Sequence, residues 1–256
     1  MTAAICLMFM VQWNRTPELD FEEHPQLIAH AGGEIYGYRL TNSLEAIDNA
    51  YTSGFRYMEL DFDLTSDGYV VLIHGWEGMC NRLTGAPGQR TLEEFQNTDT
   101  FMDLTLLTLE ELVSWLKTHP DVSVITDVKN EDNIEVLTKI QEQCGVFASC
   151  FIPQIYEYGQ YETVRSLGYE RIILTLYRMN ADYNELHNFI NTHDLWGITM
   201  SESIVSEELL EAVNAGETAV YCHSVNDLSF FELWHEKGVT GIYTDYFTPN
   251  HWPEIS

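Results

Sequence analysis

The sequence has few basic residues: Lys and Arg number 12 against 40 Asp and Glu, which gives a formal net charge of -28. Such a surface repels the phosphate backbone of nucleic acids and the headgroups of anionic lipids. Nucleic acid is therefore a poor candidate partner. An anionic small-molecule ligand would have to be attracted by a local positive charge, for which a bound divalent cation is the economical source.

Cysteine is scarce and carries no metal-site pattern. The five cysteines are scattered along 256 residues without a C-x-x-C pair, which argues against a structural zinc site. The odd number leaves at least one thiol unpaired within the chain. A chain of this length buries enough apolar surface to fold without disulfides, so the cysteines leave the redox compartment open.

The sequence also lacks an apolar run of the roughly 20 residues that cross a bilayer as a helix. Residues 3–13 form an apolar run of signal-peptide length, but without a basic segment before it or a clear cleavage site after it. We interpret 1–25 as an N-terminal extension that is either the remnant of a membrane anchor or a first element packing on the domain. Membrane association and export through this segment stay open, and the cytoplasm is the alternative location.

No linker, repeat or low-complexity tract divides the chain, so we expect a single domain over 26–256. Short runs rich in β-branched residues alternate with segments of helical period, as in proteins with a parallel α/β sheet. Helices are expected over 42–52, 109–118, 133–143, 158–167, 181–191, 206–214 and 227–237. Strands are expected over 27–30, 55–63, 69–74, 122–127, 150–154, 171–175, 196–200, 218–223 and 241–244.

Nine strands are one too many for a (β/α)8 barrel of the TIM type. The connection at 65–68, Thr-Ser-Asp-Gly, is too short for a parallel crossover, whereas its Asp-Gly suits a β-hairpin. We therefore expect 69–74 to return along 55–63 above the barrel mouth, which leaves eight strands for the barrel. The long segment from about 75 to 105 is then an inserted subdomain or lid. A doubly wound open sheet is the competing architecture.

Charged side chains end several of the expected strands. Glu59 and Asp61 lie two residues apart, and so do Asp127 and Lys129, so each pair points to one side of its strand. In a barrel enzyme the carboxyl ends of the strands build the site. An exposed acidic strand face would explain either pair taken alone, but successive strands carrying such residues favour a common site.

Three carboxylates, from Glu59, Asp61 and Asp127, are hard oxygen ligands suited to Mg²⁺ or Ca²⁺. His30 and His74 end two further strands and could serve as base and acid beside such a cation. A histidine at a strand end is by itself more often a hydrogen-bonded structural residue. Together the residues predict a metal-dependent acid/base site.

The same residues lie in motifs that resemble those of the glycerophosphodiester phosphodiesterase family. That family carries H-R-G, E-N-T-L-x-A-F, E-x-D, T-x-D-G, V-V-x-H-D, R-T-[ST]-G, E-x-K, T-V-N-[DE] and G-V-D-G-I-x-T-D in this order. The resemblance runs from about residue 27 to residue 248. The corresponding segments are His30-Ala31-Gly32, Asn42-Ser43-Leu44-Glu45-Ala46-Ile47, Glu59-Leu60-Asp61, Thr65-Ser66-Asp67-Gly68, Val70-Val71-Leu72-Ile73-His74, Arg82-Leu83-Thr84-Gly85, Asp127-Val128-Lys129, Ser224-Val225-Asn226-Asp227 and Gly238-Val239-Thr240-Gly241-Ile242-Tyr243-Thr244-Asp245.

The resemblance implies a single TIM-type barrel that cleaves a small-molecule phosphodiester. It implies that His30 and His74 form the acid/base pair and that Lys129 steadies the phosphoryl oxygens. It further implies that Glu59, Asp61 and Asp127 bind a divalent cation, either Mg²⁺ or Ca²⁺.

Five departures from the family pattern bear on the substrate, one of which is Thr41 in place of the glutamate of E-N-T. Ala31 replaces the arginine of H-R-G, and Arg39 or Arg82 could supply the lost positive charge. Gly75 replaces the aspartate after the second histidine, and His223 replaces the tryptophan before T-V-N. The third carboxylate is an aspartate, Asp127, and this Asp-x-Lys is similar to that of the sphingomyelinase D-type phospholipases.

Three functional hypotheses follow. The first is hydrolysis of glycerophosphodiesters to an alcohol and glycerol 3-phosphate. The second is a phospholipase D-like or cyclising reaction on lysophospholipids or phosphoinositides. The third is a barrel that binds phosphodiesters without cleaving them, against which stand both histidines, the three carboxylates and the lysine. The leaving alcohol and the oligomeric state stay open.

Overall fold

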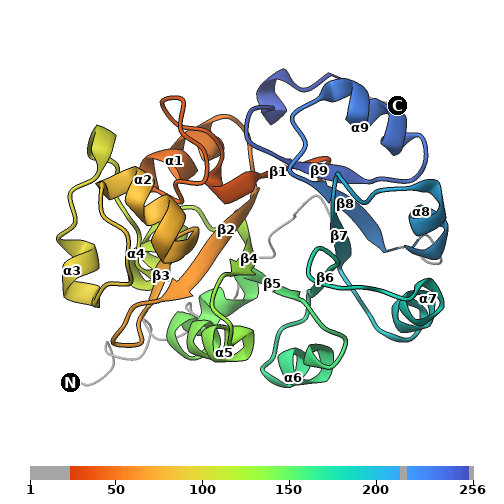
Figure 1. The fold of residues 1–256 in the computed structure, drawn as a ribbon, viewed down its shortest axis with the longest axis horizontal. Helices are drawn as coiled ribbons and strands as arrows, with labels where there is room; N and C mark the ends of the chain where they lie inside the picture. Colours follow the sequence, from red (N-terminus) through yellow and green to blue (C-terminus); the bar gives the residue numbers. More distant parts are fainter. Residues whose placement is uncertain (1–23, 214–217, 254–256) are drawn as a thin grey trace, which may run out of the picture.

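Eight parallel strands close into a barrel in the computed structural model, which describes residues 24–213 and 218–253 (Figure 1). The ring closes because the first strand pairs with the last one on one side and with the second on the other. The predicted TIM-type barrel is thus confirmed, and an open sheet is excluded because it would leave two free edges. The strands are β1 (Leu27–Ala29), β2 (Tyr57–Leu64), β4 (Ser123–Val128), β5 (Phe151–Ile155), β6 (Ile173–Thr175), β7 (Gly197–Ser201), β8 (Ala219–His223) and β9 (Gly241–Thr244).

The ninth predicted strand is the returning arm of a hairpin. β3 (Val70–Leu72) pairs antiparallel with the carboxyl-terminal end of β2, with Phe62 opposite Leu72. Gly68 has a φ of 86°, the left-handed conformation that the Asp-Gly turn requires. The hairpin therefore extends β2 beyond the barrel, as the short turn predicts.

Helices cover the outside of the barrel between consecutive strands, and several begin at clear caps (Figure 1). Thr108 and Glu111 form a reciprocal capping box at one of them. Another begins two residues later than predicted, at Leu44, because Ser43 is its N-cap and Asn42 has a φ of 52°. The helices are α1 (Leu44–Thr52), α4 (Leu109–Leu116), α5 (Asn133–Cys144), α6 (Gln160–Ser166), α7 (Tyr183–Thr192), α8 (Glu207–Val213) and α9 (Leu228–His235).

The segment between β3 and α4 folds as an inserted helical subdomain with a small core of its own. It contains α2 (Cys80–Thr84), α3 (Leu92–Gln96), a π-turn at Gly75–Met79 and a 3₁₀ turn at Phe101–Asp103. Buried side chains of this subdomain pack together and onto β3, with the rings of Trp76 and Phe95 6.0 Å apart edge to face. The subdomain is thereby fixed to the hairpin beside the barrel (Figure 1).

The barrel interior is apolar in one layer and polar in the next. Every second residue of a strand faces the barrel interior, because successive side chains of a strand alternate in direction. The apolar layer consists of Ile28, Tyr57, Ile125, Ile152, Ile173, Tyr221 and Tyr243, which form one buried cluster. Two positions further along these strands, toward their carboxyl ends, stand His30, Glu59, Asp127, Gln154, Thr175, His223 and Asp245. The register of the barrel therefore places a polar ring at its mouth.

Among the helices of the described residues, none is long and apolar enough to cross a membrane. Of the predicted N-terminal extension, residues 1–23 lie outside the part that the structure describes. The hypothesis of an anchor or an exported form therefore stays a prediction.

Candidate active site

Three carboxylates meet at the carboxyl ends of β2 and β4. The parallel register sets Asp61 directly beside Asp127, and Glu59 points to the same side two residues earlier. One oxygen from each of the three lies within 4.8 Å of the others. The side chains that the sequence predicts as a ligand set are thus brought together, and all three are buried.

Glu59 has one carboxylate oxygen that lacks a hydrogen-bond donor among the described residues. Its Oε2 accepts a 2.8 Å hydrogen bond from the backbone N–H of Ala31, whose φ of 48° turns that N–H inward. Its Oε1 is buried and accepts no hydrogen bond from any described residue. Burial, helped by the nearby charge of Asp61, raises the pKa of Glu59 to about 8. A charge at this position therefore needs a cation as its partner.

Asp61 is held by the segment that precedes α1. The side-chain amide of Asn42 donates to Asp61 Oδ2 at 2.7 Å, and the backbone N–H of Asp61 donates to Asn42 Oδ1 at 2.9 Å. This reciprocal pair explains why Asn42 stands in a left-handed conformation outside the helix. It also leaves Asp61 Oδ1 for another partner.

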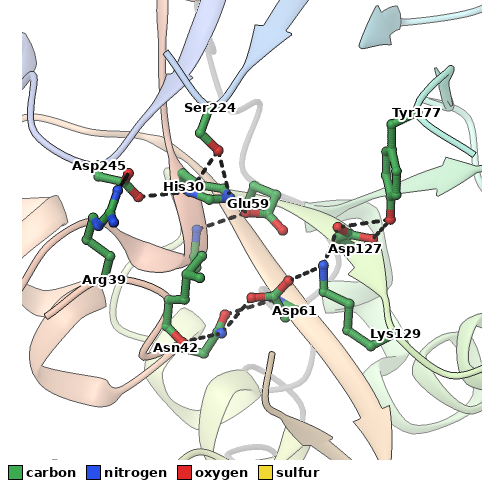
Figure 2. A network of polar contacts seen from close by, with 12 residues as sticks. His30, Arg39, Asn42, Glu59, Asp61, Asp127, Lys129, Tyr177, Ser224 and Asp245 are labelled. Carbon is green, nitrogen blue, oxygen red and sulfur yellow. Dashed lines mark hydrogen bonds and ion pairs between the residues drawn. The ribbon is translucent and has the colours of Figure 1, made fainter. Parts of the chain in front are cut away.

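That partner is Lys129, which stands between two of the carboxylates (Figure 2). Its Nζ lies 2.8 Å from Asp61 Oδ1 and 2.7 Å from Asp127 Oδ2. Burial alone would lower the pKa of this ammonium, but the carboxylates of Asp61, Asp127 and Glu59 raise it above its ordinary value. Lys129 is therefore a permanent positive charge at the mouth.

Asp127 is surrounded by donors from the loops after β5 and β6. Tyr156 donates to its Oδ1 at 2.5 Å and Tyr177 at 3.2 Å, while Arg178 Nη2 lies 4.0 Å away. Burial would raise the pKa of Asp127, but Lys129, Tyr156 and Arg178 together hold it below its ordinary value. Asp127 is thus ionised at neutral pH.

His30 follows β1 and is oriented from β9. Its Nδ1 lies 2.8 Å from Asp245 Oδ1, and its Nε2 lies 4.0 Å from Glu59 Oε2 (Figure 2). The hydroxyl of Ser224 is 3.1 Å from both ring nitrogens. Burial lowers the pKa of His30. The hydrogen bond to Asp245 and the charges of Glu59 and Asp245 have the larger, opposite effect, so the pKa of His30 lies above its ordinary value.

Asp245 is fixed in turn by two further donors. The side-chain amide of Asn226 donates to its Oδ2 at 2.8 Å and Arg39 Nη1 at 3.2 Å. Burial would raise the pKa of Asp245, yet His30, Asn226 and Arg39 lower it. The carboxylate of Asp245 is therefore charged near neutral pH.

His74 stands apart from this network. It follows β3, where the backbone N–H of Ile73 donates to the carbonyl of Asp61 at 3.0 Å and so keeps His74 near the end of β2. Its side chain is half-buried, and within the described residues it makes no hydrogen bond or ion pair. The structure thus places His74 at the correct edge of the barrel, and its role stays a prediction.

Two cavities open at the mouth, and His30 lines both of them. The inner one has a volume of about 20 Å³ and is lined by Glu59, Asp127, Gln154, Tyr177, His223 and Tyr243 besides His30. The outer one has a volume of about 440 Å³ and is lined by Arg39, Leu40, Glu202, Ser224, Asn226, Asp227 and Asp245 besides His30. The inner cavity has room for one water-sized group, whereas the outer one can hold a small organic molecule.

The residues present fit a divalent cation. Three carboxylates supply hard oxygen donors, as Mg²⁺ and Ca²⁺ prefer, and Glu59 Oε1 is a buried acceptor without a hydrogen-bond donor among the described residues. A cation here would relieve the electrostatic cost that raises the pKa of Glu59. The geometry supports a cation site and leaves the identity of the ion open.

Sequence reasoning missed several residues of this site. Asp245, His223 and Gln154 each stand two positions after an inward-facing apolar residue, so the period of two could have found them. Tyr156 and Tyr177 lie in the loops that follow β5 and β6, where no sequence pattern indicates the direction of a side chain.

Residues 31–248 match the model of a protein family described as the glycerophosphoryl diester phosphodiesterase family. A Mycobacterium tuberculosis protein assigned as glycerophosphodiester phosphodiesterase 2 is 29% identical over 155 residues, which are 59% of this chain and 57% of that protein. A Bacillus subtilis protein assigned to the same activity is 23% identical over 86% of this chain and 94% of its own length.

Solved structures of similar fold support the same architecture. A glycerophosphodiester phosphodiesterase from Thermotoga maritima superposes with a TM-score of 0.71 and 19% identity, over 87% of this chain and 95% of that one. An Oleispira antarctica phosphodiesterase, solved with its product sn-glycerol 3-phosphate, gives a TM-score of 0.70 and 19% identity, over 87% of this chain and 94% of that one. At such identities the likeness speaks for the fold.

Proposed function

The chain belongs to the glycerophosphoryl diester phosphodiesterase family, a family of phosphoric diester hydrolases, and from that membership we propose a specific reaction for it. The reaction is hydrolysis of a glycerophosphodiester to an alcohol and sn-glycerol 3-phosphate, with a divalent cation and acid/base catalysis. The observation that carries the proposal is the convergence of Glu59, Asp61 and Asp127 within 4.8 Å, with His30 4.0 Å from Glu59.

Glu59, Asp61 and Asp127 would hold the cation, which when bound would act as a Lewis acid toward the phosphodiester. Lys129 adds a second positive charge at the same place, since it already lies within 2.8 Å of two of these carboxylates. Together these charges attract an anion that the surface of the protein as a whole would repel. Lys129 then stabilises the charge that develops on the phosphoryl oxygens.

His30 and His74 would divide the proton transfers between them. One activates the nucleophile and the other protonates the leaving alcohol, which is the division of labour that two imidazoles near one phosphorus permit. Asp245 keeps His30 in place through Nδ1, so that Nε2 is the nitrogen left for the substrate. The backbone bond from Ile73 to Asp61 keeps His74 near the end of β2, from where it would take the second proton transfer.

The outer cavity supports a small organic substrate. At about 440 Å³ it is large enough for the glycerol or the alcohol portion of a glycerophosphodiester, and His30 stands at its boundary with the carboxylates. The product bound to the Oleispira antarctica relative, sn-glycerol 3-phosphate, is the phosphomonoester that the proposed reaction would release.

A coupled assay for sn-glycerol 3-phosphate tests the proposal. Purified protein is incubated with glycerophosphocholine, glycerophosphoethanolamine or glycerophosphoinositol, each with EDTA, Mg²⁺ or Ca²⁺. Release that requires one of the cations supports the reaction and identifies the ion.

Two other outcomes of the assay would replace the proposed hydrolysis with another function. A cyclic phosphate in the phosphorus NMR spectrum of the products, from these substrates or from lysophospholipids, would establish the cyclising reaction. Cation and phosphodiester binding without any product would establish a binding barrel.

A further inference from the structure

His223 is a polar residue of the barrel mouth that the proposed mechanism does not use. It ends β8 two positions after Tyr221 and so faces inward, into the polar ring. Its imidazole packs edge-on against Tyr177 at 5.4 Å and against Tyr243 at 6.0 Å between ring centroids. Its Nε2 is buried and has no hydrogen-bond partner among the described residues.

Such an unpaired nitrogen is unusual for a structural histidine. Buried polar atoms are nearly always hydrogen-bonded, because an unpaired one loses its water without compensation. His235 and His119 show the ordinary arrangement here, with Nδ1 2.7 Å from the carbonyl of Val239 and 2.8 Å from that of Trp115. His223 therefore has a hydrogen-bonding position that no described residue fills.

His223 lines the inner cavity together with His30, Glu59 and Asp127. A cavity of about 20 Å³ holds one group of the size of a water or a single oxygen atom. A non-bridging oxygen of a phosphodiester has that size. Resting on the proposed function, we propose that His223 binds the substrate directly, by donating a hydrogen bond from Nε2 to a non-bridging phosphoryl oxygen.

The charges around the cavity favour a donor here. A phosphodiester anion entering it meets the carboxylates of Glu59 and Asp127, so every donor that faces it offsets part of their repulsion. Burial and the nearby His30 lower the pKa of His223 to about 4, so its ring is neutral at pH 7 and one nitrogen carries a hydrogen. The contact adds no buried charge to the barrel mouth, where Glu59 and Asp127 already line the cavity and Lys129 is paired with Asp127.

Two donor-free variants and one donor-retaining variant test the proposal. His223→Phe keeps an aromatic ring against the two tyrosines, and His223→Ala is the second donor-free form in case the larger ring disturbs the fold. His223→Gln restores an N–H. His251→Phe is the control, because His251 is exposed and lies in the carboxyl-terminal 3₁₀ turn beside the end of α1.

Two readouts are measured for each purified variant. The first is kcat and KM for the best glycerophosphodiester, and the second is binding of sn-glycerol 3-phosphate by calorimetry in the presence of the cation. Loss of a hydrogen bond to a charged group should weaken binding of the product by about 10- to 100-fold in both donor-free variants. His223→Gln should recover most of that loss, and the control should match the unmodified protein.

Product binding as tight in His223→Phe and His223→Ala as in the unmodified protein would overturn the proposal. So would a loss that His223→Gln fails to recover while its melting temperature is unchanged, since that pattern indicates packing. Failure of the proposed reaction is seen separately, as an unmodified protein that binds sn-glycerol 3-phosphate and turns over no phosphodiester. The binding series then still decides the role of His223.

Discussion

Asp245 and His30 are 215 positions apart in the sequence and 2.8 Å apart in the barrel, between Oδ1 and Nδ1. They meet because β9 and β1 pair side by side where the barrel closes. The contact fixes the ring of His30 and leaves its Nε2 toward Glu59. A carboxylate on one ring nitrogen determines which nitrogen is free for chemistry and raises the affinity of the ring for a proton.

Asp245→Asn should therefore lower activity and shift its pH dependence. Asp245 raises the pKa of His30 against the lowering effect of burial, so that pKa falls when the carboxylate is removed. The limb of the kcat/KM profile that reports His30 should move to lower pH, and kcat/KM at pH 7 should fall by about 10- to 1,000-fold. The measurement is kcat/KM across pH 5 to 9.

Asp182→Asn is the matched control, since Asp182 is an exposed N-cap of α7 and asparagine caps a helix equally well. A pH profile of Asp245→Asn that overlies that of the unmodified protein would contradict the positioning role.

Acid should remove stability that Asp245 provides. Its folded pKa lies below its ordinary value of about 3.9, so its ionised form stabilises the fold above about pH 4. That contribution is lost as the pH falls through the folded pKa. The difference in unfolding free energy between the unmodified protein and Asp245→Asn should shrink between pH 5 and pH 3, measured by urea titration. A constant difference over this range would refute the linkage.

Removal of either proposed acid/base histidine should abolish turnover and leave the fold intact. His30→Ala and His74→Ala should each lower kcat by about 100- to 10,000-fold, as the loss of a general acid or base does. His251→Ala, at an exposed site, should keep full activity. Thermal unfolding checks the fold of each variant. His74→Ala is the sharper test, because within the described residues no hydrogen bond ties His74 to His30 or the carboxylates. Full activity of His74→Ala would leave His30 without a second acid/base group.

Asp127→Asn should chiefly weaken cation binding. One of three ligand charges is lost, so the cation concentration for half-maximal activity should rise by about 10-fold or more. Cation binding should also raise the melting temperature of the unmodified protein, and less so that of the variant, because a ligand of the native state stabilises it. Asp132→Asn, at the exposed N-cap of α5, is the control. An unchanged cation requirement would exclude Asp127 as a ligand.

The fold and the grouping of the three carboxylates could be predicted, because both depend largely on local periodicity. The period of two puts Glu59 and Asp61 on one side of β2, and the short Asp-Gly turn identifies the hairpin. The boundaries of strands shift by one or two residues, as in β2, which begins at Tyr57 instead of residue 55.

What could not be predicted depends on contacts between distant loops. Tyr177 reaches Asp127 from the loop after β6, and Arg39 reaches Asp245 from the loop after β1. Neither loop has a period that would orient these side chains. The pairing of His30 with Asp245 needs the closure of the barrel, which no local pattern specifies.

We predict that Arg39 takes over the charge missing at position 31. Ala31 is fully buried and can offer the substrate no cation, whereas Arg39 lines the outer cavity with His30. Arg82, the alternative from the sequence, is exposed on α2 in the inserted subdomain and lines neither cavity at the mouth.

Arg39→Ala should therefore raise KM for a glycerophosphodiester by about 10-fold, the effect of one lost charged hydrogen bond, with a smaller change in kcat. Arg82→Ala is the matched control and should leave both constants unchanged. Steady-state kinetics on the two variants decide between the arginines: an unchanged KM in Arg39→Ala would mean that the substrate is held by Lys129 and the cation without help from this loop.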